Sequence, residues 1–259
     1  MSIVVERLGQ GQDLVLLHGW GMNGAVWHGI VPLLSPHFRL HLVDLPGFGG
    51  SPLAEGVEYD LPWLAREVAA VLPVRAHLLG WSLGGLVASR IALDHPERVA
   101  SLVTVASSPC FLAQEEWPGI APKVLDGFMA ALGGDFRQTV ERFLAIQAMG
   151  SEHARDDIRQ LKQWLAERPA PQLPALTAGL TMLAEVDLRD ELAQLTTPWL
   201  RIYGRLDSLV PRASIPLLDG RYPHSEHQVL AKASHAPFIS HPEAFVTGLM
   251  DWLAKVNKK

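Results

Sequence analysis

The chain has 259 residues, 48% of them hydrophobic, and a formal net charge of −5 at pH 7. This length allows one large α/β domain with an insertion or two small domains, and the negative charge argues against nucleic acid as the main partner. One cysteine excludes an internal disulfide, no apolar run approaches the ~20 residues of a membrane span, and no signal-peptide pattern opens the chain. We therefore expect a cytoplasmic protein with no membrane partner, and a monomer by default.

The predicted elements alternate between short apolar runs and helical patterns, which is typical of a mostly parallel sheet with crossover helices. An edge strand near residues 3–8 is expected to pair antiparallel. Six further strands are expected at residues 14–18, 39–43, 77–80, 99–106, 199–203 and 227–231. Helical patterns between and after these strands include residues 61–71, 83–94 and 241–254.

The alternation stops after Cys110 and resumes near Leu188. Helical patterns follow one another in this block, at residues 122–132, 136–149, 153–167 and 174–184. We interpret residues 111–187 as a helical cap inserted into an α/β core made of residues 1–110 and 188–259, because the later strands complete a sheet begun earlier. Two helical domains in tandem are the alternative.

The segment Gly80-Trp81-Ser82-Leu83-Gly84 lies between a predicted strand and a predicted helix. A serine on a sharp strand-to-helix turn needs glycine two positions before and two after it, so this context predicts a nucleophile elbow. The turn would expose the Ser82 hydroxyl at the carboxyl edge of the sheet. A serine that merely caps a helix on a glycine-rich turn is the alternative.

A serine nucleophile needs a histidine base, and the base needs an acid that fixes its tautomer. Asp207 follows the predicted strand at residues 199–203, and His235 follows the last predicted strand, in the chain order Ser, acid, His that α/β-hydrolases use. Asp187, Asp190 and Asp219 are weaker candidates for the acid. For the base, His235 is favoured over the other histidines, among them His18, His224, His227 and His241.

Two glycine-containing loops follow the first two predicted parallel strands. The loop Leu17-His18-Gly19-Trp20-Gly21 lets a backbone N–H face the reacting carbonyl, so we assign the oxyanion donors to the backbone N–H groups of Trp20 and Leu83. His18 belongs to this loop rather than to the base. The loop at residues 44–51 is interpreted as structural, shaping the rim of the site.

Together these motifs resemble the α/β-hydrolase fold over nearly the whole chain. They are more closely similar to the pimeloyl-[acyl-carrier protein] methyl ester esterases of biotin synthesis, on the segments at residues 15–20, 80–89, 105–111, 116–120, 139–145 and 235–242. The resemblance implies a serine carboxylesterase that hydrolyses the methyl ester of a carrier-bound pimeloyl chain and releases methanol. It also implies a substrate channel with a contribution from Phe143, Leu144, Ala145, Ile146 and Gln147, beside Trp20, Ser82, Leu83 and His235.

A basic cluster in the cap offers a surface for a partner. Arg155, Arg159 and Lys162 fall on one face of one predicted helix, and Arg137 and Arg142 come from the preceding helix. A solvated face is the plain interpretation, because acidic residues lie among them. The resemblance favours a docking site for the acidic acyl-carrier protein.

Other functions remain open from the residues alone. A general short-chain carboxylesterase or thioesterase would use the same triad and accept small esters. A non-catalytic ligand-binding hydrolase fold is a more remote possibility. No cofactor is expected, and no metal, because His18, His235 and the acids lack ligand spacing.

Overall fold

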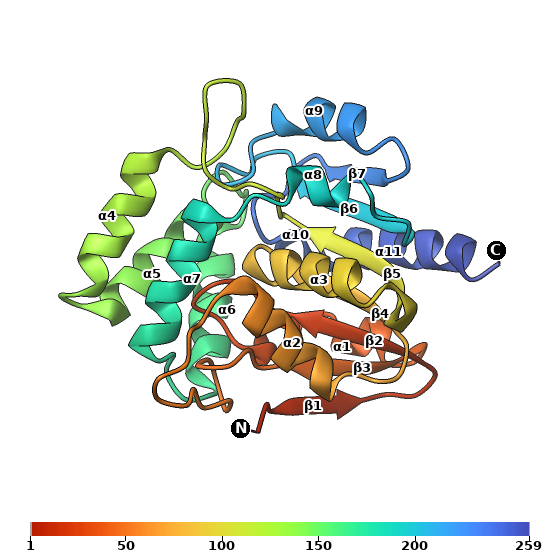
Figure 1. The fold of residues 1–259 in the computed structure, drawn as a ribbon, viewed down its shortest axis with the longest axis horizontal. Helices are drawn as coiled ribbons and strands as arrows, with labels where there is room; N and C mark the ends of the chain where they lie inside the picture. The colour runs from red at the N-terminus through yellow and green to blue at the C-terminus, as the bar shows by residue number, and fades with distance from the viewer. Residues whose placement is uncertain (1, 259) are drawn as a thin grey trace.

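The structure is a computed structural model that describes residues 2–258. Its strands form one seven-stranded sheet in the order β1-β3-β2-β4-β5-β6-β7 (Figure 1). Strand β1 pairs antiparallel with β3, and the other neighbouring pairs are parallel. The strands are β1 (Val5–Leu8), β2 (Gln12–Leu17), β3 (Phe38–Val43), β4 (Ala76–Trp81), β5 (Val99–Val105), β6 (Trp199–Gly204) and β7 (Glu226–Leu230). The expected mostly parallel α/β fold, with its antiparallel edge strand, is confirmed.

Helices cover both faces of this sheet. In the view of Figure 1, α2 (Leu61–Val71), α3 (Leu83–Asp94) and α8 (Arg189–Leu192) lie in front of the strands, and α1 (Val31–Leu34) and α11 (Pro242–Val256) lie behind them. The remaining elements outside the block 111–187 are the 3₁₀ turns η1 (Gly24–Trp27) and η2 (Pro96–Arg98), with α9 (Ser214–Arg221) and α10 (Pro237–Ser240). None of the helices in residues 2–258 combines the length and apolar character needed to cross a bilayer.

Four helices lie between β5 and β6 in the chain, within the segment 111–187, which we call the cap. They are α4 (Pro122–Leu132), α5 (Phe136–Gln147), α6 (Ala154–Ala166) and α7 (Leu173–Glu185). Figure 1 places them beside the end of the sheet toward which the arrowheads of β2 and β5 point. The carboxyl ends of parallel strands are where open α/β sheets collect their functional groups, so the cap lies next to the expected site.

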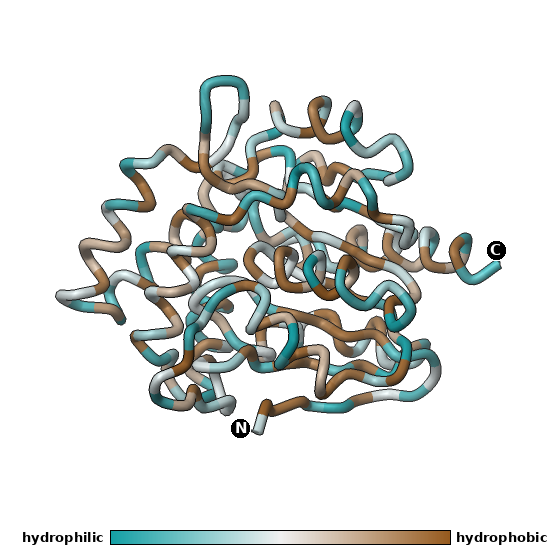
Figure 2. Tube along the Cα trace, viewed as in Figure 1, coloured by the Kyte–Doolittle hydropathy of each residue, from teal (hydrophilic) through white to brown (hydrophobic). Residues whose placement is uncertain are grey.

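Burial explains the difference between the sheet and the cap. All six residues of β4 are buried, as a parallel strand covered on both faces requires. Figure 2 shows long apolar stretches along the central strands, whereas the cap helices alternate between apolar and polar residues. Asp135 is the N-cap of helix α5, and its carboxylate accepts a hydrogen bond from the backbone N–H of Gln138. The cap helices therefore bury one side, against one another and against the core.

Candidate active site

The turn from β4 to α3 holds Ser82 in an unusual backbone conformation, with φ of 54° and ψ of −119°. The flanking glycines permit this turn because backbone atoms crowd them. A Cβ on Gly80 would lie 2.2 Å from the carbonyl oxygen of Gly84, and one on Gly84 would lie 2.4 Å from that of Leu17. No larger residue fits at either glycine without a shift of backbone, so the strain at Ser82 is built in by its neighbours.

Ser82, His235 and Asp207 lie in one hydrogen-bonded chain. The Oγ of Ser82 is 3.0 Å from Nε2 of His235, and Nδ1 of His235 is 2.8 Å from Oδ2 of Asp207. The other carboxylate oxygen of Asp207 accepts hydrogen bonds from the backbone N–H groups of Leu209 and Val210. Because a carboxylate only accepts, Nδ1 carries the proton and Nε2 faces the serine as an acceptor. This is the arrangement of a nucleophile, a base and an orienting acid.

The alternative acids and bases occupy other places. Asp187 pairs with Arg189, Asp190 with Arg221, and Asp219 with Arg201. His227 contacts Asp219, and His241 contacts the hydroxyl of Ser240. The carboxyl pKa values of Asp187 and Asp219 are lowered. For Asp187 the hydrogen bonds from Arg189 lower it, and for Asp219 burial opposes the lowering, which comes from Arg201 and His227.

The loop after β2 lies against the elbow. A Cβ on Gly19 would lie 3.2 Å from the Cβ of Ser82, so the two turns are in direct contact. Leu83 is the first residue of α3, where backbone N–H groups have no partner within the helix. The predicted oxyanion residues, Trp20 and Leu83, therefore come from two turns that meet at the serine.

His18 is fully buried in the same loop, and burial lowers the pKa of its ring to about 4. Its Nε2 accepts a hydrogen bond from the backbone N–H of Leu45, so Nδ1 carries the proton and donates to the carbonyl of Gly19 at 2.8 Å. His18 therefore holds the backbone of the loop, and the histidine hydrogen-bonded to Asp207 is His235.

Cap residues close over the triad. The rings of Trp20 and Phe143 meet edge to face with centroids 4.7 Å apart, and the indole N–H of Trp20 donates to the carbonyl of Leu176 in α7. The Ser82 side chain is buried, with a residue exposure of 1%. Residues of both the cap and the core therefore enclose the Ser82 side chain.

The five residues expected to line the substrate channel differ in burial, because successive residues of a helix face different sides. Phe143, Leu144 and Gln147 are buried, whereas Ile146 is half-buried and Ala145 is exposed. The backbone carbonyl of Gln147 accepts a hydrogen bond from the N–H of His235, which places this residue beside the triad. Both polar atoms of its amide are buried without a hydrogen-bond partner within residues 2–258. Such a group is rare in a folded protein and points to a ligand or a water molecule. The sequence carried no sign of this unpaired amide.

The predicted docking arginines lie on the outer side of the cap. Arg137 and Arg142 of α5 and Arg155 and Arg159 of α6 are all exposed. Arg159 pairs with Asp156 at 3.0 Å, and Arg142 donates to the side chain of Gln138. Arg137 and Lys162 line a cavity of about 280 Å³ between α5 and α6, with Phe136, Val140 and Arg168 among the other lining residues. The sequence did not single out Arg168.

No three His, Cys, Asp or Glu side chains within residues 2–258 are grouped as a metal ion would require. A serine, a histidine and nearby backbone N–H groups in this arrangement are the groups that acyl transfer requires.

The comparisons with known proteins agree with this geometry. The family model of the alpha/beta hydrolase fold matches residues 14–242, so the chain belongs to that family. Among solved structures, an esterase from Exiguobacterium antarcticum superposes with a TM-score of 0.88 at 24% identity, covering 97% of this chain and 95% of its own. At that identity the likeness concerns the fold alone.

Two curated relatives are much more similar in sequence. The pimeloyl-[acyl-carrier protein] methyl ester esterase of Aeromonas hydrophila is 77% identical over 246 residues, which is 95% of this chain and 97% of that protein. The protein of the same name from Yersinia enterocolitica is 54% identical over 250 residues, with 96% of each chain covered. Within the alpha/beta hydrolases, the chain therefore belongs to the pimeloyl-[acyl-carrier protein] methyl ester esterase family.

Proposed function

We propose that this protein hydrolyses the methyl ester of pimeloyl-[acyl-carrier protein], giving methanol and the pimeloyl carrier used in biotin synthesis. The hydrogen-bonded chain from Ser82 through His235 to Asp207 carries this proposal. All three side chains come from one polypeptide, so a monomer has a complete set of reacting groups. The high identity to esterases of this name supports the choice of substrate. We place the reaction in the cytoplasm, as expected from the sequence.

The mechanism follows from the positions of the hydrogen-bonded atoms. Oγ of Ser82 attacks the ester carbonyl while Nε2 of His235 takes its proton. The backbone N–H groups of Trp20 and Leu83 stabilise the negative oxygen of the tetrahedral intermediate. Collapse of this intermediate breaks the bond to the methoxy oxygen, which leaves as methanol with the proton from His235. Water then attacks the acyl-enzyme by the same route, which frees Ser82 and the carboxylic acid.

The pocket suits a neutral ester on an alkyl chain. Trp20, Leu83, Phe143 and Leu144 are buried apolar residues of the expected channel, with the unpaired amide of Gln147 among them. We propose that this amide contacts a polar atom of the bound substrate. The freed carboxylate costs more to keep in an apolar channel than the ester did, so its charge favours release of the product. The proposal predicts that the ester-bearing carrier binds Ser82→Ala protein more tightly than the free-acid carrier, and equal affinities would contradict it.

We also propose that Arg137, Arg142, Arg155 and Arg159 dock the acidic carrier protein. Their exposure on α5 and α6 leaves them available to a partner, although the net charge of the chain opposes an acidic one. Charge reversal of Arg155 and Arg159 to Glu should raise KM for the carrier-linked ester in a salt-dependent way and leave hydrolysis of a p-nitrophenyl ester unchanged. Arg66→Glu, on the exposed side of α2, is the matched control. Unchanged carrier kinetics would contradict docking at this surface.

The deciding experiment compares pimeloyl-carrier methyl ester with p-nitrophenyl butyrate as substrates, with Ser82→Ala as control. A strong preference for the carrier-linked ester, lost in the variant, supports the proposal. Hydrolysis of the small ester alone would leave a general carboxylesterase. A fluorophosphonate that labels the wild type but not Ser82→Ala would identify the nucleophile, and absence of both labelling and turnover would leave a ligand-binding fold.

A further inference from the structure

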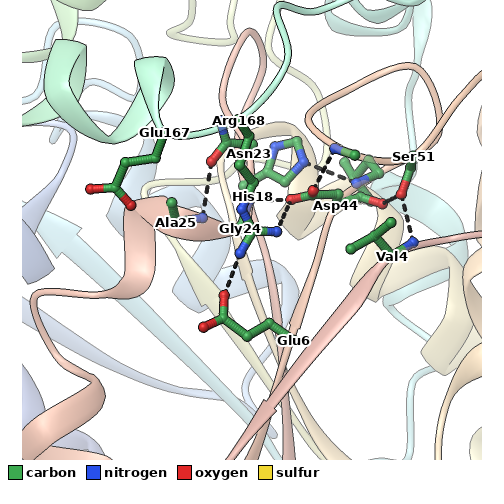
Figure 3. Close-up of polar contacts among 12 residues, drawn as sticks. Val4, Glu6, His18, Asn23, Gly24, Ala25, Asp44, Ser51, Glu167 and Arg168 are labelled. Carbon is green, nitrogen blue, oxygen red and sulfur yellow. Dashed lines mark hydrogen bonds and ion pairs between the residues drawn. The ribbon is translucent and has the colours of Figure 1, made fainter.

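A carboxylate is fully buried in the core next to the candidate active site. Asp44 follows β3 directly, and its side chain has no exposed surface. Its Oδ1 accepts a hydrogen bond from the backbone N–H of Gly24 at 2.7 Å, and its Oδ2 accepts one from the N–H of Gly50 at 2.8 Å (Figure 3). Asp44 therefore joins the start of η1 to the loop at residues 44–51.

The countercharge for Asp44 comes from the cap. Arg168 lies in the connection between α6 and α7, and its guanidinium is 2.8 Å from Oδ1 of Asp44. The same guanidinium also pairs with Glu6 of β1, and only 14% of the side chain is exposed. His28 extends this network, because its ring contacts both Glu6 and Glu167 at 3.1 Å. Figure 3 shows Arg168 placed between the two carboxylates of the core. A residue of the cap thus compensates a buried charge of the core.

Asp44 also lies next to the loop after β2, whose backbone carries one proposed oxyanion donor, the N–H of Trp20. The next residue, Leu45, donates its backbone N–H to Nε2 of His18 at 3.0 Å, and His18 donates through Nδ1 to the carbonyl of Gly19. In a trans peptide the N–H points opposite to the carbonyl, so the Gly19 carbonyl fixes the direction of the Trp20 N–H. The loop is therefore held at both ends beside Asp44, through His18 at one end and Gly24 at the other.

We propose that Arg168 is a positioning residue for the oxyanion hole, acting through Asp44 on the backbone of residues 18–24. This inference rests on the proposed esterase function. Without Arg168, Asp44 is a buried charge with two backbone donors and no countercharge, and the chain around it must move to bring in water. A shift of the Trp20 N–H then weakens its bond to the oxyanion, since misplacements near 1 Å are enough to reduce turnover strongly.

The first test is the kinetics of Arg168→Met with p-nitrophenyl butyrate, a substrate that needs no carrier. We expect kcat to fall about tenfold, less than the roughly 10²–10³-fold loss for removal of one oxyanion donor, with KM nearly unchanged. A trifluoromethyl ketone, which forms a tetrahedral oxyanion on Ser82, should bind more weakly by the same factor. Arg168→Lys keeps the charge and should recover part of both losses. If Arg168→Met does not fold, the Lys variant carries the test, with a smaller loss of kcat matched by the loss of inhibitor affinity.

A double variant separates charge compensation from simple packing. Replacing both partners of a buried ion pair leaves no uncompensated charge, although the Asn amide can accept only one of the two backbone N–H bonds that Asp44 accepts. The loss of kcat in Asp44→Asn/Arg168→Met should therefore be smaller than the product of the losses in the two single variants. Arg66→Met, which removes an exposed arginine of α2 that contacts Glu67, is the matched control and should leave kcat unchanged.

Two results would overturn the inference. One is a lower melting temperature for Arg168→Met with wild-type kcat per folded protein, which would make the ion pair purely structural. The other is a fall of kcat with unchanged affinity for the ketone, which would place the effect outside the oxyanion hole. Failure of the proposed function looks different, because the wild type would then show neither turnover nor labelling of Ser82.

Discussion

The elbow and the cap contribute to the same site in different ways. In the elbow, Gly80 is packed against the backbone of Gly84, and Gly84 against the backbone of Leu17 at the end of β2, so close backbone contacts set the position of Ser82. In the cap, Phe143 packs its ring on Trp20, Gln147 accepts a backbone hydrogen bond from His235, and Arg168 forms an ion pair with Asp44. The difference teaches that the core positions the proposed nucleophile and base, whereas the cap supplies groups that surround them. Changes in the core should therefore affect every substrate, and changes in the cap should alter binding, stability and the precision of the site.

The largest effect tests the core side of this comparison. Asp207→Asn should lower kcat about 10⁴-fold for carrier-linked and small esters alike, because the amide no longer fixes the tautomer of His235. Initial rates combined with thermal melts would separate this loss from unfolding. Asp190→Asn, at a carboxylate that is 92% exposed, is the control and should retain full activity. A loss below tenfold in Asp207→Asn would mean that another acid orients the base.

His18 should make the fold sensitive to acid. Burial lowers its pKa to about 4 from the ordinary value of 6.5, so between these pH values the unfolded chain binds a proton that the folded protein does not. Stability should therefore fall as the pH drops from about 6.5 to 4, by about 3 kcal/mol from this residue alone. Urea unfolding of wild type and His18→Asn across this range would measure the difference in slope. Parallel curves would contradict a neutral buried His18.

The Gln147→Leu variant tests whether Gln147 contributes to substrate binding at a cost to the stability of the fold. The variant removes two buried polar atoms that lack partners, so the free energy of unfolding should rise by about 1–3 kcal/mol. At the same time kcat/KM for the carrier-linked ester should fall, because the amide can no longer contact the substrate. Denaturant unfolding and steady-state kinetics on the same preparations would test both halves. A more stable variant with unchanged kinetics would remove Gln147 from the substrate site.

The smallest effects concern the packing of cap glycines. A Cβ on Gly179 of α7 would lie 2.6 Å from Cδ1 of Trp20, so Gly179→Ala should cost about 1–3 kcal/mol of stability and shift the indole. Gly127 of α4 has no neighbouring atom within 4 Å of such a Cβ, so Gly127→Ala should stabilise the protein by about 0.4–1 kcal/mol. Thermal melts of the pair would show whether α7 and α4 differ in this way, and equal shifts would contradict close packing of α7 on the core.

The strands and the chain order of the candidate triad residues could be predicted from local sequence patterns. Six parallel strands begin and end within a few residues of their expected limits. Five of them, β2 to β6, contain buried apolar runs bounded by turns, which are distinctive in a parallel sheet, whereas the edge strand β7 is largely exposed. The short elements η1, α1 and α8 were not expected, since three or four residues carry too little periodicity. Ala145 was expected in the substrate channel with its neighbours, but it lies on the exposed side of α5. A five-residue segment of helix cannot present all its side chains to one side.

The sequence by itself determined the elbow, the order of the reacting residues and the fold family. These features can be predicted from short stretches of sequence, because the spacing of glycines between a strand and a helix is a local pattern. Only the tertiary structure decided the partners of Asp44, the unpaired amide of Gln147 and the contact of Gly179 with Trp20. Arg168 and Glu6 are 162 positions apart in the chain, and no local pattern indicates that they meet. Long-range ion pairs and packing depend on how the cap folds back on the core, and that is a property of the whole chain.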